Sequence, residues 1–497
     1  MSKKLLGLRL EPHDASISYY DGECIRYLKT ERQRQSKHHS YTNLWEWRSD
    51  IQKAWGLDYR DVDEIAYLPY NSSIAPYVDQ YKNLAVEYDY FPAPCKTWSI
   101  NHHYAHALSH YGSIDPDVSI VIDGQGEINV AWSVFKNDQI VEYALISSCG
   151  SVGDSYNEAG RAVGVISEHG LDIAGKTMGV QSYGKFDVDF YKSLSDLSIY
   201  NINRIYDWKR WVAYVGCELL ADIRRIDWIN TIHVKTGEAI LGLFKSHCKP
   251  NDVIYYSGGC AQNVLWNTTL KKHFKNLVIH PHVADDGCSL GAVEFLRKKN
   301  NLPPVPIIGF PFSVHDESPD SVPSTDTVIK TAQYLSEGKI VAWYQGHGEM
   351  GFRALGNRSI LMDPRISDGK IKINAVKRRE NYRPFGASIL LEHKDKYFDM
   401  PFENEYMLYV GECNTKEFPA ITHVDGTSRV QTVGKINNPF RNLLEEFYML
   451  TGCPVLLNTS LNLAGKPIAG SISEAHQLYN ESNIDVLVVG NNIYSKE

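Results

Sequence analysis

A strand pattern that occurs twice limits most strongly how this chain can fold. The apolar run KLLGLRL (residues 4–10) is followed by the polar stretch EPHDAS and then by SISYYDGECIRYLK. The last stretch predicts a β-hairpin, because Asp21-Gly22 is a strong tight-turn signal. The same order returns at residues 119–146, where SIVIDGQGE is followed by INVAWSVF, the turn KNDQ and IVEYALI. Two copies of strand, polar loop and hairpin indicate an internal duplication.

A duplication of this kind is typical of the actin-like (ASKHA) α/β fold, which is also that of hexokinase. The alternative is a pair of unrelated β-meanders. A third motif, VIYYSGGCAQNVLWNTTL (residues 253–270), combines an apolar strand, the triplet Ser257-Gly258-Gly259 and a predicted helix. Backbone amides at a glycine-rich helix start can approach a nucleotide closely, so this motif favours the actin-like interpretation.

The chain has 497 residues, which is too long for one ordinary hydrophobic core. The clearest boundary is the segment 301–325, which has six prolines and no helical periodicity. After it, TDTVIKTAQYLSEGKIVAWYQG predicts a capped helix and a strand that open a second α/β domain. We predict an N-terminal domain over residues 1–300, a linker over 301–325 and a C-terminal domain over 326–497.

The charge and composition of the chain restrict its partners and location. The formal net charge of -8 argues against a protein that wraps nucleic acid or lies on anionic lipid, and favours small molecules. The chain has no run of about 18 apolar residues, and Arg9 interrupts the N-terminal apolar stretch. We therefore predict a cytoplasmic protein without a membrane span. The nine cysteines never form C-x-x-C, which disfavours a zinc ribbon or a disulfide framework.

Four histidines lie close together in the stretch INHHYAHALSHY (residues 100–111). On a helix His102 and His106 share one face, and two imidazoles at this spacing suit Fe, Zn or another first-row divalent ion. His110 would extend that face, whereas His103 would point away. The alternative is a histidine-rich surface helix that binds no metal.

A metal site of this kind needs a carboxylate, and two aspartates follow predicted strands. Asp123 ends the strand in VIDGQGE, and Asp285 opens ADDGCSLGA after the strand-like LVIHPHV. Carboxylates at strand ends in the two halves of a cleft could meet the histidine helix from opposite sides.

Ten stretches spread over nearly the whole chain also form a recognisable series. In order they are HDAS, ERQRQSKHH, HHYAHALSHY, IDGQGE, GKTMGVQSYGK, SGGCAQN, DDGCSLGA, GFRALGNRSIL, KRRENYRPFGASIL and NTSLNLAGKPI. This series resembles the O-carbamoyltransferases of the NodU/CmcH type, which include antibiotic carbamoyltransferases.

The resemblance implies a two-step enzyme. A C-terminal YrdC-like domain would make carbamoyl-adenylate from ATP and carbamoyl phosphate, with Mg²⁺ accompanying the nucleotide. The actin-like N-terminal domain, similar to the one used in tRNA threonylcarbamoyl-adenosine synthesis, would transfer the carbamoyl group to an acceptor hydroxyl. The metal of this second site would be Fe(II) or another divalent ion. Its ligands map onto His102, His106, Asp123 and Asp285.

Cationic side chains are concentrated between residues 353 and 383. Such a run is usually a solvated face, but here the arginines of FRALGNRS flank glycine turns and RPFG precedes an apolar strand, so the charges would surround a cleft. Guanidinium groups bind phosphate oxygens bidentately, and a lysine acts as a point charge. We assign Arg353, Lys377 and Arg383 to catalysis and to binding of the donor and nucleotide, and Arg358 to binding alone.

Three further motifs are expected to contact the reactants. Asn458 and Ser460 follow a buried strand in PVLLNTSLN and would bind an anion or a ribose; the alternative is an ordinary turn. His13 of HDAS is a predicted base or anion contact, or a turn histidine. SGGCAQN is expected to cradle the adenosine. Its contact residues would be Gly258, Gly259 and Asn263.

The acceptor is the least constrained part of the prediction. The segment 205–229 interleaves tryptophans with arginines, so it is either an amphipathic helical insert or the site that selects the acceptor. We expect a hydroxyl group of a small molecule, such as a sugar or natural product. The alternatives are a hydroxymethyl group of a nucleobase, in a nucleotide or in nucleic acid, and tRNA threonylcarbamoylation by a fused enzyme. The sequence also leaves open whether the protein forms a homodimer.

Overall fold

The computed structural model describes residues 3–43, 45–69, 84–88, 94–126, 129–435 and 438–496. These residues belong to two compact units. Unit 1 comprises Met1–Thr30 and His38–Ile308, and unit 2 comprises Glu31–Lys37 and Gly309–Glu497. The second boundary falls within the proline-rich segment 301–325, and the short piece Glu31–Lys37 groups with unit 2.

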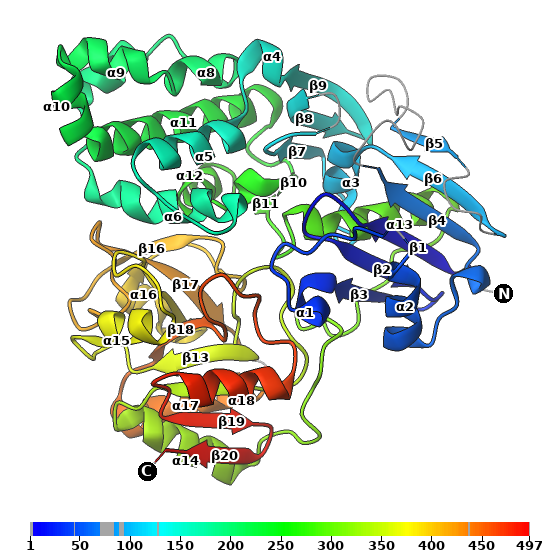
Figure 1. Cartoon of the computed structure of the whole chain (residues 1–497), viewed down its shortest axis with the longest axis vertical. Coiled ribbons are helices and arrows are strands. Elements are labelled where there is room, and N and C mark those ends of the chain that lie inside the picture. Colours follow the sequence, from blue (N-terminus) through cyan, green and yellow to red (C-terminus); the bar gives the residue numbers. More distant parts are fainter. Residues whose placement is uncertain are drawn as a thin grey trace. The chain divides into compact units, whose positions relative to one another are not determined.

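Unit 1 contains two sheets with the same strand arrangement (Figure 1). The first sheet has the order β3-β2-β1-β4-β6-β5, and the second has the order β11-β10-β7-β8-β9. In each sheet an antiparallel meander is followed by a parallel strand beside its first member, β4 beside β1 and β10 beside β7. The predicted α/β class and the actin-like duplication are therefore confirmed.

The strands of the first sheet are β1 (Leu5–Arg9), β2 (Ser16–Tyr20), β3 (Ile25–Lys29), β4 (Glu64–Leu68), β5 (Ala85–Glu87) and β6 (Lys96–Ile100). Those of the second sheet are β7 (Val118–Ile122), β8 (Val130–Lys136), β9 (Gln139–Leu145), β10 (Ile254–Ser257) and β11 (Leu277–Val278). Both predicted hairpins are present. Gly22 has a φ of 105° in the first turn, and Asn137 and Asp138 have φ values of 50° and 59° in the second. Positive φ at both central residues is what a two-residue hairpin turn requires.

The helices up to residue 300 are α1 (Thr30–Arg34), α2 (Trp47–Trp55), α3 (His102–Leu108), α4 (Ile146–Cys149), α5 (Val152–Ala162), α6 (Ile173–Val180), α7 (Val188–Ser193), α8 (Ile202–Ile205), α9 (Trp208–Val215), α10 (Glu218–Ile223), α11 (Arg225–His247), α12 (Val264–His273) and α13 (Cys288–Lys299). Helix α13 packs on β1, β2 and β4, helix α3 packs on β7, β8 and β10, and the two helices pack on each other (Figure 1). This helix pair therefore joins the two sheets of unit 1.

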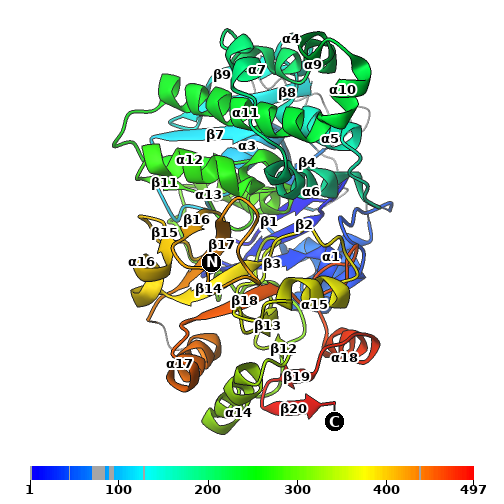
Figure 2. The same cartoon turned by 90° about the vertical axis from the view of Figure 1, so that its left-hand side faces the viewer.

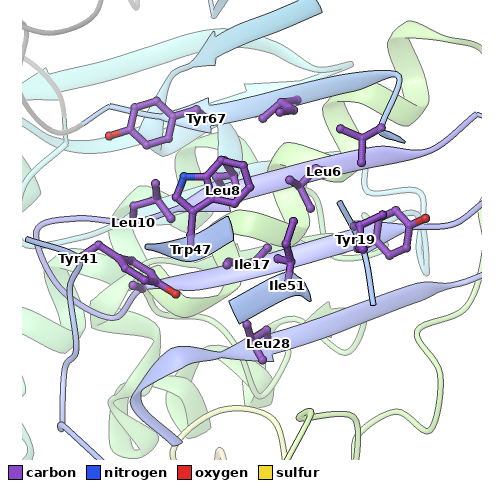
Figure 3. Close-up of a cluster of buried hydrophobic side chains, with 14 residues drawn as sticks. Leu6, Leu8, Leu10, Ile17, Tyr19, Leu28, Tyr41, Trp47, Ile51 and Tyr67 are labelled. Atoms are coloured by element: carbon purple, nitrogen blue, oxygen red, sulfur yellow. The ribbon is translucent and has the colours of Figure 1, made fainter. Parts of the chain in front are cut away.

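The two faces of β1 show how the sequence positions this arrangement. Leu6 and Leu8 point into a buried cluster with Trp47 and Ile51 of α2 (Figure 3), and each buried leucine stabilises the fold by about 2 kcal/mol. Gly7 lies on the opposite face, where an added Cβ would come within 2.1 Å of a backbone oxygen of α13. The glycine thus lets α13 pack directly on the strand.

Unit 2 contains a mixed sheet with the order β15-β16-β17-β14-β18-β13-β12-β19-β20. Its strands are β12 (Val341–Tyr344), β13 (Arg358–Met362), β14 (Gly386–Leu390), β15 (Phe398–Asp399), β16 (Val410–Cys413), β17 (Thr427–Val433), β18 (Val455–Ser460), β19 (Val486–Val489) and β20 (Asn492–Ser495). Its helices are α14 (Thr325–Ser336), α15 (Gly369–Val376), α16 (Lys394–Tyr397), α17 (Pro439–Thr451) and α18 (Ile472–Glu481). The predicted opening of this domain is confirmed: Ser324 caps α14, which leads into β12 and packs against α17 (Figure 2).

Within the described ranges no helix combines the length and the apolar composition that a bilayer crossing needs.

Candidate functional site

The histidine cluster lies at the start of α3. The Asn101 side chain caps this helix by accepting a hydrogen bond of 2.9 Å from the Tyr104 amide, so the helix begins at His102. The Nε2 atoms of His102 and His106 lie 3.1 Å apart on one face, as the spacing predicted. His103 points elsewhere, with its Nδ1 atom 2.8 Å from the Ser133 hydroxyl.

The structure brings both predicted carboxylates to these two imidazoles. Asp123 follows β7 directly, and its Oδ2 atom lies 3.1 Å from His102 Nε2 and 3.6 Å from His106 Nε2. Asp285 opens the short 3₁₀ helix η7 (Asp285–Gly287), and its Oδ1 atom lies 3.4 Å from His102 Nε2 and 3.3 Å from His106 Nε2. The four side chains therefore converge on one point.

The geometry of this convergence fits a metal ion. Ligand atoms bound at about 2.1 Å from one ion lie about 3.0 Å apart in octahedral geometry and about 3.4 Å apart in tetrahedral geometry. The separations between imidazole nitrogens and carboxylate oxygens span 3.1 to 3.6 Å. All four side chains are buried, and a set of imidazoles and carboxylates suits a first-row divalent ion.

Neighbouring groups hold the carboxylates in place. Gly259 donates its backbone N–H to Asp123 Oδ1 over 2.8 Å, and an added Cβ on this glycine would lie 2.7 Å from the same oxygen. Gly258, with a φ of 95°, passes close to the end of β7. Arg9, on the same face of β1 as Gly7, donates a hydrogen bond to Asp285. The glycine loop thus positions the Asp123 carboxylate.

The charges of the four groups compensate one another. Burial lowers the pKa of His102, but the neighbouring groups, Asp285 first among them, together raise it to about 10. Burial raises the pKa of Asp285, but His102 and Arg9 hold it well below its ordinary value. The raised pKa values of both histidines favour their positively charged imidazolium form, and a divalent cation would supply the same two positive charges.

His13 lies next to this set through a chain of paired side chains. Its Nδ1 atom is 2.9 Å from Asp14 Oδ2 and 3.8 Å from Asp285 Oδ2. Asp14 Oδ1 lies 2.8 Å from His38 Nδ1, and His38 Nε2 lies 3.4 Å from Asp172 Oδ1. The predicted His13 is therefore a neighbour of the candidate metal ligands, and His38 lies next to it through Asp14.

A second constellation, the cationic cluster, lies in unit 2. Burial lowers the pKa of Arg353 well below its ordinary value, and the charges of Arg429 and Arg383 lower it further. Burial and then Arg383 lower the pKa of Arg429 to about 10. In the part of the chain that the structure describes, neither Arg353 nor Arg429 pairs with a carboxylate. The members of the cluster are Arg353, Lys377, Arg379, Arg383 and Arg429.

Sequence reasoning missed Arg429. It lies in the alternating strand stretch TSRVQTV, far along the chain from the cationic run. Parallel pairing of β14 with β17 sets Arg429 opposite Gly386, the last residue of the RPFG motif. Only this register brings it to Arg353 and Arg383, so the sequence offers no local signal for it.

Lys377 is held by oxygens of the Asn-Thr-Ser motif region. Its Nζ atom donates to the Ser460 hydroxyl over 3.2 Å and to Asn462 Oδ1 over 2.7 Å. The predicted Lys377 and Ser460 are thus in contact, and Asn462 is a further member that was not predicted. Asn458 lies deeper in the sheet, where its side-chain amide donates to the Ser388 hydroxyl over 2.9 Å.

The structure does not bring Arg358 into the cationic cluster. Its Nη2 atom donates to Asp316 Oδ1 over 3.1 Å and to the Gly346 carbonyl over 2.9 Å, and its guanidinium stacks 3.6 Å above the Tyr344 ring. Asn263, likewise, caps helix α12, since its side-chain oxygen accepts from the Leu265 amide over 3.2 Å.

The aromatic segment 205–229 forms α9, α10 and the start of α11. Trp211 and Trp228 are buried, and Arg224 pairs with Asp187 over 2.7 Å while lying 5.1 Å above the Trp211 ring. Arg224 packs on Trp211 and Trp228 packs edge-on against Trp208, so these tryptophans pack within the helices, as in the helical-insert alternative.

Comparison with known proteins identifies the family. Residues 77–293 match the model of the carbamoyltransferase N-terminus, and residues 332–496 match that of the carbamoyltransferase C-terminus. The nodulation protein NolO of Bradyrhizobium diazoefficiens is 31% identical, over 79% of this chain and 78% of its own length. The chain therefore belongs to the carbamoyltransferase family, and the predicted transferase is confirmed.

Two other similarities differ in extent. The 3'-hydroxymethylcephem-O-carbamoyltransferase of Streptomyces clavuligerus is 36% identical over 49% of each chain. The solved structure of HypF from T. kodakarensis is 13% identical, covers 61% of this chain and 48% of its own, and has a TM-score of 0.39.

Proposed function

We propose that the protein is an ATP-dependent O-carbamoyltransferase that forms carbamoyl-adenylate from carbamoyl phosphate and ATP. The carbamoyl group would then pass to a hydroxyl of a small molecule, such as a sugar or natural product. The cationic cluster of unit 2 is the observation that carries this proposal. Its half-buried guanidinium groups repel one another, and a bound polyanion would compensate their charges.

The donor reaction needs fixed cations at two stages. Water first hydrolyses carbamoyl phosphate to carbamate and phosphate. An oxygen of the carbamate then attacks the α-phosphorus of ATP, which forms carbamoyl-adenylate and releases pyrophosphate. Arg353, Arg383 and Arg429 would bind the phosphate oxygens, and Mg²⁺ would accompany the nucleotide. Lys377, fixed by Ser460 and Asn462, would place a point charge beside the leaving pyrophosphate.

The transfer reaction would use the residues of unit 1. The two histidines and two aspartates would hold Fe(II) or another first-row divalent ion, which would polarise the carbamoyl carbonyl when bound. His13, next to this set, would accept the proton of the acceptor hydroxyl, and Asp14 would fix its ring. Gly258 and Gly259 would border the adenylate. The relative that acts on a hydroxymethyl group of a cephem, by its name, supports a small-molecule hydroxyl as acceptor.

The test is pyrophosphate release from ATP. We expect release to require carbamoyl phosphate and to fall about 100-fold or more in Lys377→Met. The control Lys372→Met changes an exposed lysine of the same helix region and should leave release intact. Release that instead required bicarbonate and threonine would refute the proposal in favour of threonylcarbamoylation. Mass spectrometry of sugars, nucleosides and oligonucleotides would then identify the acceptor by the gain of one carbamoyl group.

A further inference from the structure

Cys288 lies beside the proposed metal ligands. His102, His106, Asp285 and Cys288 are all buried, and their ligand atoms lie within 4.8 Å of one another. Two ligands of one ion, bound at about 2.0 to 2.3 Å, can be at most about 4.4 Å apart. Adjacent ligands of one ion lie about 3.0 to 3.6 Å apart, so the thiol needs a shift of at most about 1 to 2 Å to bind the same ion. Two candidate ligand sets therefore share His102, His106 and Asp285. Asp123 completes the first set, and Cys288 completes the second.

The packing of α13 explains how the thiol reaches this position. Helix α13 begins at Cys288, one turn after Asp285, so both side chains lie on the same side of the helix start. Gly291, a further three residues on, faces α3, where an added Cβ would lie 1.8 Å from the Ala105 carbonyl oxygen. Ala105 stands between His102 and His106 in sequence. The close approach at Gly291 thus brings Cys288 to the two imidazoles.

We propose that the Cys288 thiolate is a further ligand of this metal ion and makes the site select Fe²⁺, Co²⁺ or Zn²⁺ over Mg²⁺ and Mn²⁺. A coordinating thiol loses its proton, and thiolate is a softer donor than the carboxylates that suit Mg²⁺ and Mn²⁺. The inference rests on the proposed function, because the ion is the one proposed there. It adds a ligand and a selectivity that the histidine spacing did not predict.

Cobalt substitution of the full-length protein tests the ligand directly. The protein is stripped with a chelator and loaded with Co²⁺ under anaerobic conditions. We expect the wild type to show a strong thiolate-to-cobalt charge-transfer band in the near ultraviolet together with weaker d–d bands in the visible. Cys288→Ser should keep the d–d bands and lose the charge-transfer band. The matched control Cys248→Ser removes another buried cysteine of unit 1, outside the cluster, and should keep both.

Two further measurements complete the test. In competition between Zn²⁺ and Mn²⁺, Cys288→Ser should lose about 10-fold or more of the preference for Zn²⁺. X-ray absorption of the Zn²⁺-loaded wild type needs no variant, and should show a sulfur neighbour at about 2.3 Å. A wild type that binds cobalt with d–d bands, but shows neither the charge-transfer band nor the sulfur neighbour, would overturn the inference and leave the metal centre standing. A wild type that binds no cobalt would overturn the metal centre itself and the inference with it.

Discussion

Replacement of Arg429 by methionine should stabilise unit 2 in the absence of ligand, although the same change removes donor binding. Burial and repulsion by Arg383 lower the pKa of Arg429 from 12.5 to about 10. At about 1.4 kcal/mol per pKa unit, the charged side chain destabilises the folded state by at most about 3 kcal/mol. Because the folded pKa lies below the unfolded one, this penalty is present in full at neutral pH. Partial solvent access reduces it to about 1 to 2 kcal/mol.

Urea unfolding with and without inorganic pyrophosphate measures both effects. Without the anion, Arg429→Met should unfold at a higher urea concentration than the wild type. Pyrophosphate at about 100 times its dissociation constant should stabilise the wild type by about 2.7 kcal/mol and the variant much less, so that the order reverses. Methionine keeps the apolar stem of the side chain, and the comparison therefore isolates the charge.

The control is an arginine of the same unit that has partners. Arg441 is buried, and its Nη2 atom lies 2.6 Å from Glu392 and 2.7 Å from Glu445. Arg441→Met should destabilise the protein by about 1 to 3 kcal/mol and leave the pyrophosphate effect unchanged. If Arg429→Met were destabilised to the same degree as Arg441→Met, the arginines of the cationic cluster would not repel one another as proposed. The main argument for a polyanionic donor at this site would then fail.

Three further predictions concern unit 1. Burial lowers the pKa of His38, but its two aspartate partners raise it to about 9. Its ion pairs with these aspartates therefore stabilise the fold in full below about pH 6.5, and this stabilisation is lost as the pH rises through 9. The difference in unfolding midpoint between wild type and His38→Gln should shrink accordingly, and a constant difference would contradict this. Since the pKa of His102 without metal is about 10, metal binding at neutral pH should release protons. Calorimetry in buffers of different ionisation enthalpy measures the number of protons released, and zero release would count against the metal site. Gly291→Ala places a Cβ 1.8 Å from the Ala105 oxygen, so it should lose metal and about 1 to 3 kcal/mol of stability. Gly242→Ala in α11, which has open space, should be neutral or stabilising in thermal melts, and equal losses in both variants would refute the packing argument.

Local sequence patterns predicted those parts of the structure that local chemistry determines. The Asp21-Gly22 turn fixes a hairpin through positive φ, and the four-residue spacing of His102 and His106 fixes one helix face. The position of Asp123 after a strand followed from the apolar run before it. Each of these features depends on residues that are close together in the sequence, so local sequence patterns are sufficient to predict it.

Relations that depend on packing could not be predicted in this way. The contact of Cys288 with the histidines requires α13 to approach α3 at Gly291, and the place of Arg429 requires the register of β14 with β17. Arg358 lies outside the cationic cluster for the converse reason. Its guanidinium donates largely to backbone carbonyls. Because every residue has a carbonyl group, the side-chain sequence does not show which arginine will be bound by one.

The two equivalent strands of the duplicated sheets contribute different side chains to the candidate metal site. Strands β1 and β7 hold equivalent places in the two sheets, each between an antiparallel and a parallel neighbour. Both end at the site, but β1 ends in Arg9, whereas β7 is followed by Asp123. Arg9 donates a hydrogen bond to Asp285, whereas the Asp123 carboxylate lies beside the His102 imidazole. One fold, used twice, thus places a cation and a carboxylate at the ends of equivalent strands, and only the carboxylate lies next to the imidazoles.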